Sequence, residues 1–180
     1  MCGRFGVEDD LSQQVESDFN IAFHSAVNAN ICPSMLLPTI IKTDSGLQQF
    51  NGSWGIKPSW SNKLLINAQS ETAATKPTFK NSFQHYRCII PMSYWYEWCE
   101  VEGQKQKVKY KFSPIESRVF YMAGIFFPTS ENDADIVSLT TSPNDQYKAY
   151  HHRMPLLVDS SWLETAHFES AQNIPFLISS

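Results

Sequence analysis

The chain has 180 residues, of which 42% are hydrophobic and 18% are charged, a balance typical of a folded globular protein and not of a disordered one. Its length fits one domain over residues 1–180 with a sizeable core. The net charge of -4 excludes a chain that binds nucleic acid through global charge, so any nucleic-acid site must be a local basic patch.

The cysteine pattern and the absence of targeting segments indicate the compartment. Four cysteines are far apart and form no C-x-x-C pair, which excludes zinc-ribbon and thioredoxin-type sites. There is no signal-peptide pattern, and no apolar run approaches the ~20 residues that span a bilayer. We expect a cytoplasmic monomer with reduced thiols, no cofactor or metal and no membrane partner.

The first five residues, Met-Cys-Gly-Arg-Phe, place a cysteine directly after the initiator methionine. Removal of Met1 would leave Cys2 with an α-amine and a thiol on adjacent carbons. An α-amine is less basic than a lysine amine, so a larger share of it is neutral and nucleophilic at pH 7. The amine can attack a carbonyl carbon, and the thiol can then close a thiazolidine ring. The alternative is that the small second residue has no function.

The first half of the chain predicts one helix and several strands. Leu11, Val15, Phe19 and Phe23 recur at helical spacing and predict a helix over 11–23. A hairpin of strands 38–42 and 47–50 follows, with a turn at 44–46. Residues 52–60 are aromatic and rich in turn residues, which indicates an ordered loop. A short strand is expected over 64–66.

The second half predicts strands over 87–91, 93–101, 105–112, 118–127, 135–141 and 155–158. A helix is expected over 143–150, and a last one over 161–172, where Ser161 and Glu164 form a capping-box pattern. Strands outnumber helices and are mostly sequential. The fold class is therefore α+β, with a mixed, largely antiparallel, barrel-like sheet flanked by a few helices.

Four lysines, at positions 105, 107, 109 and 111, share one face of the strand predicted over 105–112. Such a ladder is usually a solvated face or a guarded sheet edge. Nucleic-acid binding is the alternative.

Three polar residues lie in apolar or aromatic surroundings, where burial costs free energy unless they are paired. Asn67 ends an apolar strand, and Glu97 stands between Tyr96 and Trp98. A glutamate there suits general acid/base work, or it pairs with an arginine such as Arg87. His151 lies at a predicted helix-to-strand junction, where sites often occur, although a structural role is the alternative.

These residues, together with Cys2, allow two kinds of chemistry. A thiol nucleophile with an imidazole and an amide is the set of a cysteine peptidase. An imine-forming amine with acid/base helpers is the other assembly. The residues alone leave both open.

Several ordered motifs resemble the SOS response-associated peptidase (SRAP) family, which processes abasic sites. They occupy residues 1–5, 54–60, 67–72, 87–91, 95–98, 123–124 and 151–155. The resemblance implies the SRAP fold. It also implies that mature Cys2 forms a Schiff base, then a thiazolidine crosslink, with the aldehyde of an abasic site in single-stranded DNA. A peptidase activity that exposes the cysteine is implied too, although only Met1 precedes it here.

By position, the resemblance implies that Asn67 orients Cys2, that His151 assists ring opening and proton transfer, and that Glu97 is the acid/base for ring closure and release. It also implies a set of DNA-binding residues, for which core packing is the alternative at the two tryptophans: Arg4, Pro33, Trp54, Gln69, Trp98, Thr140 and Arg153.

The chain departs from the family pattern at three places. Gln69 stands where an arginine is usual, so one phosphate contact is weakened. His152 stands where an aspartate is usual, which changes the proton inventory beside His151. Residues 92–94 replace a small-acid-glycine run, so we expect that loop to have a different shape. The chain ends at Ser180, earlier than in typical members, which predicts either an exposed sheet edge or a more open groove.

Overall fold

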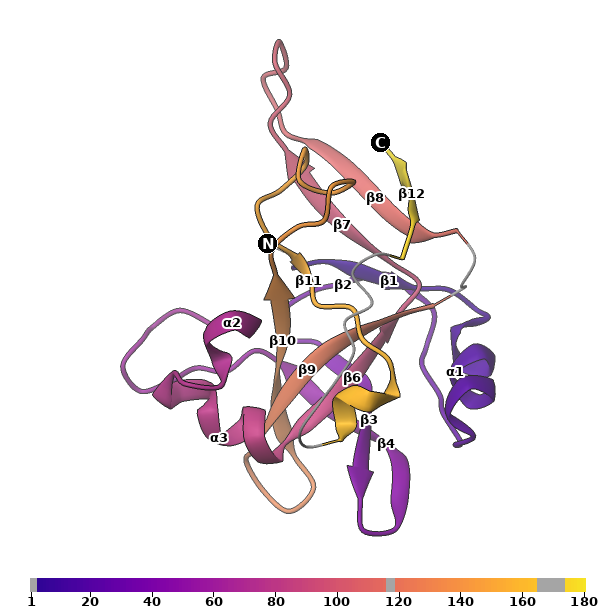
Figure 1. Ribbon diagram of the computed structural model, residues 1–180, viewed down its shortest axis with the longest axis vertical. Helices are drawn as coiled ribbons and strands as arrows, with labels where there is room; N and C mark the ends of the chain where they lie inside the picture. Colours follow the sequence, from indigo (N-terminus) through magenta and orange to yellow (C-terminus); the bar gives the residue numbers. More distant parts are fainter. Residues whose placement is uncertain (1–2, 116–118, 165–173) are drawn as a thin grey trace.

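Two β-sheets with a few short helices build the protein (Figure 1). The computed structural model describes residues 3–115, 119–164 and 174–180. Sheet A has five strands in the order β12-β8-β7-β1-β2. Their bounds are β1 Phe5–Val7, β2 Asn28–Ile31, β7 Tyr94–Cys99, β8 Val108–Pro114 and β12 Phe176–Ser179.

Sheet B has seven strands, and five of them close into a ring because β10 pairs with both β9 and β4. The β10 pairings with β4 and β5 are parallel, and the others are antiparallel. The strands are β3 Leu36–Thr43, β4 Gly46–Trp54, β5 Asn67–Gln69, β6 Arg87–Met92, β9 Phe120–Pro128, β10 Ala134–Thr141 and β11 Met154–Pro155. The α+β class with a mixed, largely antiparallel sheet is confirmed, although sheet A lies outside the ring and the whole is not one barrel.

The helices are short and lie at the periphery of the sheets. They are α1 Leu11–Phe19, α2 Ser70–Ala73, α3 Pro77–His85 and the 3-10 helix η1 Ser160–Leu163. Among the described residues, every helix is too short and too polar to span a bilayer.

The chain passes from sheet B to sheet A at one residue, Ser93, between β6 and β7. Ser93 is buried, its backbone N–H donates to the carbonyl of Gly6, and its hydroxyl accepts from the backbone N–H of Glu8. The Tyr94 ring lies directly over Gly6, where an added Cβ would be 2.2 Å from the ring. These contacts fix the position of β1, the strand that leads to the N-terminus.

Large aromatic residues fill the core. Trp54, Trp95 and Trp162 are each fully buried, and Trp95 stacks on Phe112 with ring centroids 5.2 Å apart. Trp54 packs against Phe5, with centroids 5.3 Å apart. The core thus contacts the same strands, β1 and β7, that hold several of the predicted site residues, and it makes their backbones rigid.

Several predicted elements have different bounds in the structure. Helix α1 stops at Phe19 because Asn20 adopts a left-handed conformation, with φ 52°. Residues 145–150 form hydrogen-bonded turns and not a helix, and 64–66 contribute only a bridge between Leu65 and Ile56. The strand predicted over 155–158 is limited to β11 and a bridge at Leu157. The strands β1, β2 and β12 and the helices α2 and α3 were not predicted, and β5 follows directly after the strand predicted over 64–66.

The predicted C-terminal helix differs in its start as well. Residues 160–163 form a 3-10 turn whose cap is Asp159, which accepts from the backbone N–H of Ser161. Its continuation over 165–172 lies outside the described residues. The guarded-edge interpretation of the lysine strand is wrong for its second half, since β12 pairs with β8 from Lys111 to Pro114.

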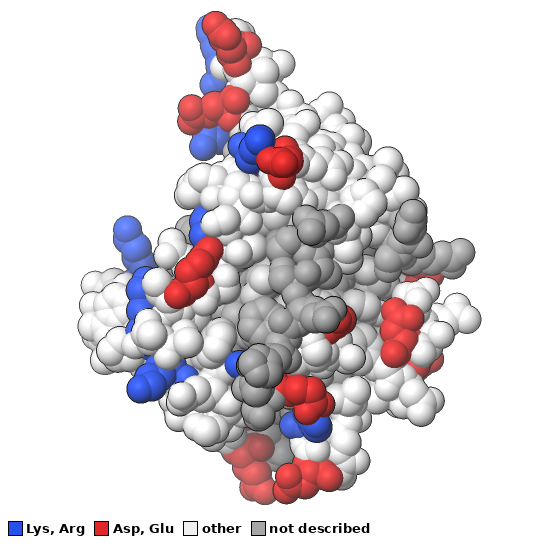
Figure 2. All heavy atoms as spheres, viewed as in Figure 1, with Lys and Arg blue, Asp and Glu red and all other residues white. Residues whose placement is uncertain are grey.

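Charge is unevenly distributed over the face shown in Figure 2. Lysines and arginines gather on the side of α2 and α3, whereas aspartates and glutamates gather beside α1 and at the opposite end from the β7–β8 hairpin. The tip of the β7–β8 hairpin has both positively and negatively charged side chains. A chain of net charge -4 can therefore present local basic areas to a polyanion.

Candidate active site

Asn67 is held by the parallel pairing of β5 with β10, in which it lies opposite Ser138. The Ser138 hydroxyl is 2.5 Å from Asn67 Oδ1 and 3.0 Å from the Ile66 carbonyl oxygen. Since Oδ1 accepts this hydroxyl, the Asn67 nitrogen is the donor end of the amide. Ser138 is fully buried, and sequence reasoning missed it. A serine inside the apolar strand 135–141 was the available signal.

Glu97 is buried, with 5% of its surface exposed, on the inner face of β7. Its Oε2 accepts a hydrogen bond of 3.2 Å from the Tyr147 hydroxyl, which lies 3.4 Å from the indole nitrogen of Trp95. Glu97 is thus a buried carboxyl group, shielded from bulk water, with the Tyr147 hydroxyl as a hydrogen-bond donor. Tyr147 is fully buried and was also missed.

Arg87, the arginine considered as a partner of Glu97, is bound at the other end of the molecule. Its guanidinium donates to the carbonyl oxygens of Phe83, Trp162 and Glu164 and stacks on the rings of Phe83 and Trp162. Burial lowers the pKa of the Arg87 guanidinium. These contacts give Arg87 a structural role, holding η1 against β6.

His151 follows the turns of 145–150, and its backbone N–H donates to the Tyr147 carbonyl. His151 Nδ1 lies 3.0 Å from both the backbone nitrogen and the carbonyl oxygen of Arg153, so these contacts fix the ring through Nδ1 whichever nitrogen has the proton. Burial lowers the pKa of His151, and the nearby Glu97 carboxylate opposes this by raising it. Glu97 and His151 therefore act on each other electrostatically, and Tyr147 contacts both.

His152 stacks on His151, with ring centroids 4.2 Å apart and an interplanar angle of 30°. Its charge lowers the pKa of His151 further. The stacked pair favours the neutral form of His151, which can accept or relay a proton near pH 7.

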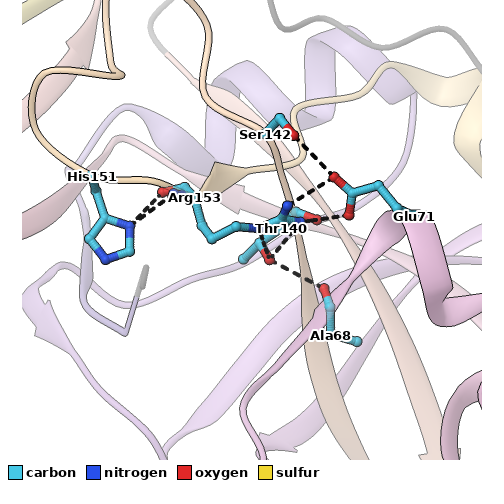
Figure 3. Close-up of polar contacts among 6 residues, drawn as sticks. All are labelled: Ala68, Glu71, Thr140, Ser142, His151 and Arg153. Atoms are coloured by element: carbon cyan, nitrogen blue, oxygen red, sulfur yellow. Dashed lines mark hydrogen bonds and ion pairs between the residues drawn. The ribbon is translucent and has the colours of Figure 1, made fainter.

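Arg153 lies in a network that links β10, β11 and α2 (Figure 3). Its guanidinium makes two bonds to the Glu71 carboxylate, of 2.9 and 2.7 Å, and one of 2.7 Å to the Thr140 carbonyl oxygen. The bond from Arg153 lowers the pKa of Glu71 to about 2. Arg153 is thus held rigidly, with part of its charge already matched. Thr140 is buried, so its side chain supports Arg153 and does not line an open groove.

Arg4 is half-buried and directly precedes β1. One guanidinium nitrogen donates to Asn30 Oδ1 at 2.6 Å, and Cζ lies 5.8 Å from the Trp98 ring centroid. Trp98 keeps 38% of its surface exposed, so its ring is accessible for stacking. Arg4 and Trp98 together form a cation beside an open aromatic face.

The remaining predicted DNA-binding residues differ in accessibility. Trp54 is fully buried, and its indole nitrogen donates to the Ile66 carbonyl, so the core-packing interpretation holds and stacking on a base does not. Pro33 is half-buried in the turn after β2, and Gln69 is exposed at the end of β5. Sequence reasoning missed Trp60, which is 67% exposed in the loop after β4.

The structure brings the candidate residues together in two groups. Glu97 and His151 meet at Tyr147, while Asn67 and Arg153 are tied to the same strand, β10, through Ser138 and Thr140. Cys2 lies outside the described residues. Within the described ranges, no three His, Cys, Asp or Glu side chains are placed to hold a metal ion. The groups present can orient a substrate, donate a hydrogen bond and move a proton.

A model of the family described as SOS response associated peptidase (SRAP) matches residues 1–177. The chain belongs to the SRAP family. Curated SRAP relatives are named abasic site processing proteins. YoqW of Bacillus subtilis is 30% identical, over 91% of this chain and 80% of YoqW. YedK of Escherichia coli is 30% identical, over 88% and 75%. HMCES of Xenopus tropicalis is 28% identical, over 62% of this chain and 43% of HMCES.

Solved structures share the SRAP fold with this chain. One protein of Bordetella bronchiseptica has a TM-score of 0.77 at 19% identity, covering 99% of this chain and 98% of its own. At that identity the likeness concerns the fold alone. A phage-related protein of the same organism has a TM-score of 0.73 at 25% identity, covering 92% of this chain and 83% of its own.

Proposed function

We propose that this SRAP protein processes abasic sites by forming a covalent thiazolidine crosslink with the aldehyde of an abasic site in single-stranded DNA, as part of the DNA damage (SOS) response. The observation that supports this most is the grouping of Glu97, Tyr147 and His151 in a chain whose relatives are named abasic site processing proteins. The reacting group is Cys2 after removal of Met1.

The first step is Schiff-base formation. The α-nitrogen of Cys2 attacks the aldehyde carbon of the ring-opened sugar, and the resulting carbinolamine loses water to give an imine. His151 acts here, since its imidazole can transfer a proton to the oxygen that leaves as water. The Asn67 amide, fixed by Ser138, orients the reactants by donating a hydrogen bond.

The second step closes the ring. The Cys2 sulfur adds to the imine carbon, and the thiol proton is transferred to the imine nitrogen, so that atoms balance without an external reagent. Glu97, held by Tyr147, relays that proton, and in the reverse direction it assists release. Burial of Glu97 keeps bulk water away from the transfer.

The flanking DNA is bound by Arg4, Trp98 and Arg153, with Pro33 and Gln69 beside them. Arg4 and Arg153 supply positive charge for phosphates, and Trp98 an open face for a base. The cytoplasm, or the nucleoid when bound to DNA, is the proposed location.

A denaturing gel tests the proposal. Mature protein is incubated with an oligonucleotide that has one abasic site, and a shifted band that resists denaturation is expected. Cys2→Ala should abolish the band, whereas Cys32→Ala, a matched cysteine variant away from the N-terminus, should keep it. No band with the mature protein, or an undiminished band for Cys2→Ala, would disprove the proposal. Intact mass establishes whether Met1 has been removed.

The family description favours a second candidate, a peptidase with Cys2 as thiol nucleophile and His151 as base. An N-terminal extension that blocks the α-amine separates the two, because it abolishes crosslinking and leaves a thiol-driven peptidase active. Binding to intact oligonucleotides without any Cys2 dependence would instead indicate a single-strand-binding module.

A further inference from the structure

The outer face of sheet A holds a row of aromatic rings with cations on both sides. The row follows β7 and consists of Tyr94, Tyr96 and Trp98. Ring centroids are 5.2 Å apart for the first pair and 6.3 Å for the second. Residues two apart on a strand recur at about 6.6–6.8 Å, so the row is a regular consequence of β geometry.

Strand β8 supplies the cations on one side. Lys109 Nζ lies 3.6 Å from the Tyr96 ring centroid and 5.7 Å from that of Trp98, while Lys111 Nζ lies 3.7 Å from the Tyr94 centroid. Lys109 is exposed and Lys111 half-buried. The lysines of this strand are therefore placed over aromatic rings and are not a uniformly solvated face.

Arg4, the residue directly before β1, supplies the cation on the side of the row opposite β8. Arg4 lies 5.8 Å from the Trp98 centroid, and its carbonyl accepts from the backbone N–H of Tyr96. Two acidic groups of the described chain pair with lysines along the row: Glu8 contacts Lys111 at 3.4 Å, and Glu100 contacts Lys107 at 3.5 Å. Neither of these two ion pairs involves Lys109, which lies over Tyr96 at the centre of the row. The centre of the row thus offers positive charge to a ligand.

The exposure of the three rings decreases from Trp98 to Tyr94. Trp98 is 38% exposed, Tyr96 is half-buried, and Tyr94 is buried between Gly6 and Lys111. A base can stack at the Trp98 end, and beyond it the row offers ammonium groups above partly covered rings. That pattern suits a backbone with regularly spaced phosphates whose bases are free to stack, as in single-stranded DNA.

We propose that Tyr96, Lys109 and Lys111 extend the DNA site beyond Trp98, so that the outer face of sheet A binds the single strand on one side of the lesion. The proposal rests on the proposed function for the identity of its ligand. Lys109 and Lys111 contact successive phosphates, and Tyr96 and Trp98 contact bases or sugars between them. Arg4 is two residues from Cys2, so this path ends next to the reactive terminus.

The test uses noncovalent binding of an intact single-stranded oligonucleotide, measured by fluorescence anisotropy across a salt series. The double variant K109Q/K111Q removes two cations while keeping aliphatic cover over the tyrosine rings. Two single-strand phosphate contacts correspond to a decrease of about 1.4 in the slope of log affinity against log salt. K109R/K111R should restore the slope.

The matched control is K105Q/K107Q, which removes the same charge from the same hairpin but from residues nearer its tip. Its salt slope should stay within about 0.3 of the unmodified protein, because one lysine contact accounts for about 0.7. Equal losses for the two pairs, or no loss for K109Q/K111Q, would overturn the proposal. Should the double variant fail to fold, K109Q and K111Q singly, each lowering the slope by about 0.7, replace it.

Crosslinking distinguishes failure of this inference from failure of the proposed function. Abasic oligonucleotides are truncated on the 5′ side or on the 3′ side of the lesion, and the affinity loss of K109Q/K111Q should disappear with truncation on one side only. If the unmodified protein crosslinks but neither truncation matters, the path is wrong and the function stands. If it never crosslinks yet the slope changes as expected, the path stands and the chemistry fails.

Discussion

The Arg153 guanidinium and the Glu71 carboxylate form a bidentate ion pair, with bonds of 2.9 Å from Nη1 and 2.7 Å from Nη2. A third bond joins Arg153 to the Thr140 carbonyl, so the guanidinium has one partner on α2 and one on β10. In the proposed complex, a DNA phosphate at Arg153 would share the guanidinium with Glu71. We therefore expect the carboxylate to fix the direction of Arg153 and to lower its affinity for DNA.

Replacing Glu71 with Gln should tighten DNA binding. The variant removes a competing negative charge, and the Thr140 carbonyl continues to hold Arg153. Because Glu71 is half exposed, with 45% of its side chain accessible, we expect a gain of about two- to fivefold at low salt. Anisotropy with an intact oligonucleotide measures it, with E131Q in an exposed loop as control. Weaker binding by E71Q would mean that orientation matters more than charge.

The same pair predicts a pH-dependent contribution to stability. The folded pKa of Glu71, about 2, is below its ordinary value of 4.5, so its stabilisation is fully present above pH 4.5 and is lost as the pH falls towards 2. Solvent screening limits the contribution to about 0.2–1 kcal/mol. Urea unfolding at pH 6 and at pH 3 should show the difference between the original chain and E71Q shrinking at the lower pH. A constant difference would contradict this.

Exchange of His152 for Asp should raise the pKa of His151. The imidazole of His152 lowers it in this chain, and a carboxylate at the same place would favour the protonated ring. NMR titration of the His151 ring protons measures the shift, with H152N as the uncharged control. The arm of the crosslinking pH profile that reports His151 should move in the same direction. An unchanged His151 titration in H152D would exclude this electrostatic link.

Removal of the Tyr147 hydroxyl should slow crosslinking. Tyr147→Phe leaves the Glu97 carboxyl without the donor at 3.2 Å and the Trp95 indole without its acceptor. We expect about 1–3 kcal/mol less stability, and a crosslinking rate lower by about tenfold or more, because acid/base assistance typically contributes a hundredfold or more. Tyr86→Phe, at the residue between α3 and β6, is the control. Wild-type crosslinking rates in Tyr147→Phe would remove the proposed role of this group.

The two tryptophans predicted to stack on DNA should separate into distinct classes. Trp98→Ala should lower affinity for single-stranded DNA by about 1–3 kcal/mol with little effect on unfolding, since its ring is exposed. Trp54→Phe should leave affinity unchanged and cost about 1–3 kcal/mol of stability through the lost bond to Ile66 and the smaller ring. Parallel urea and anisotropy curves would show the contrast, and a reversed pattern would refute the assignment.

Local patterns in the sequence were sufficient for part of the fold. The hairpin of β3 and β4 was predicted because Gly46 and its neighbours form a turn between apolar alternations. The site residue Glu97 was found because a charge in an aromatic strand is conspicuous. Both inferences use only residues near one another in the chain.

Pairings between distant residues decided the rest. Tyr147 reaches Glu97 across 50 positions, and Glu71 reaches Arg153 across 82, and nothing local marks either partner. Tertiary packing makes Trp54 buried and Trp98 exposed, and their local sequences do not indicate this difference. The short strands β1 and β2 were missed for the same reason, because their hydrogen bonds join segments that have weak propensity alone.

The packing of the Tyr94 ring over Gly6 fixes the N-terminal strand β1 to β7. Cys2 is four residues before Gly6 in the sequence, so the proposed reacting group is tethered by a short segment to a fixed point of sheet A. The proposed chemistry therefore favours an aldehyde whose DNA strand is already bound to the surface of sheet A, because binding raises its effective concentration at the N-terminus.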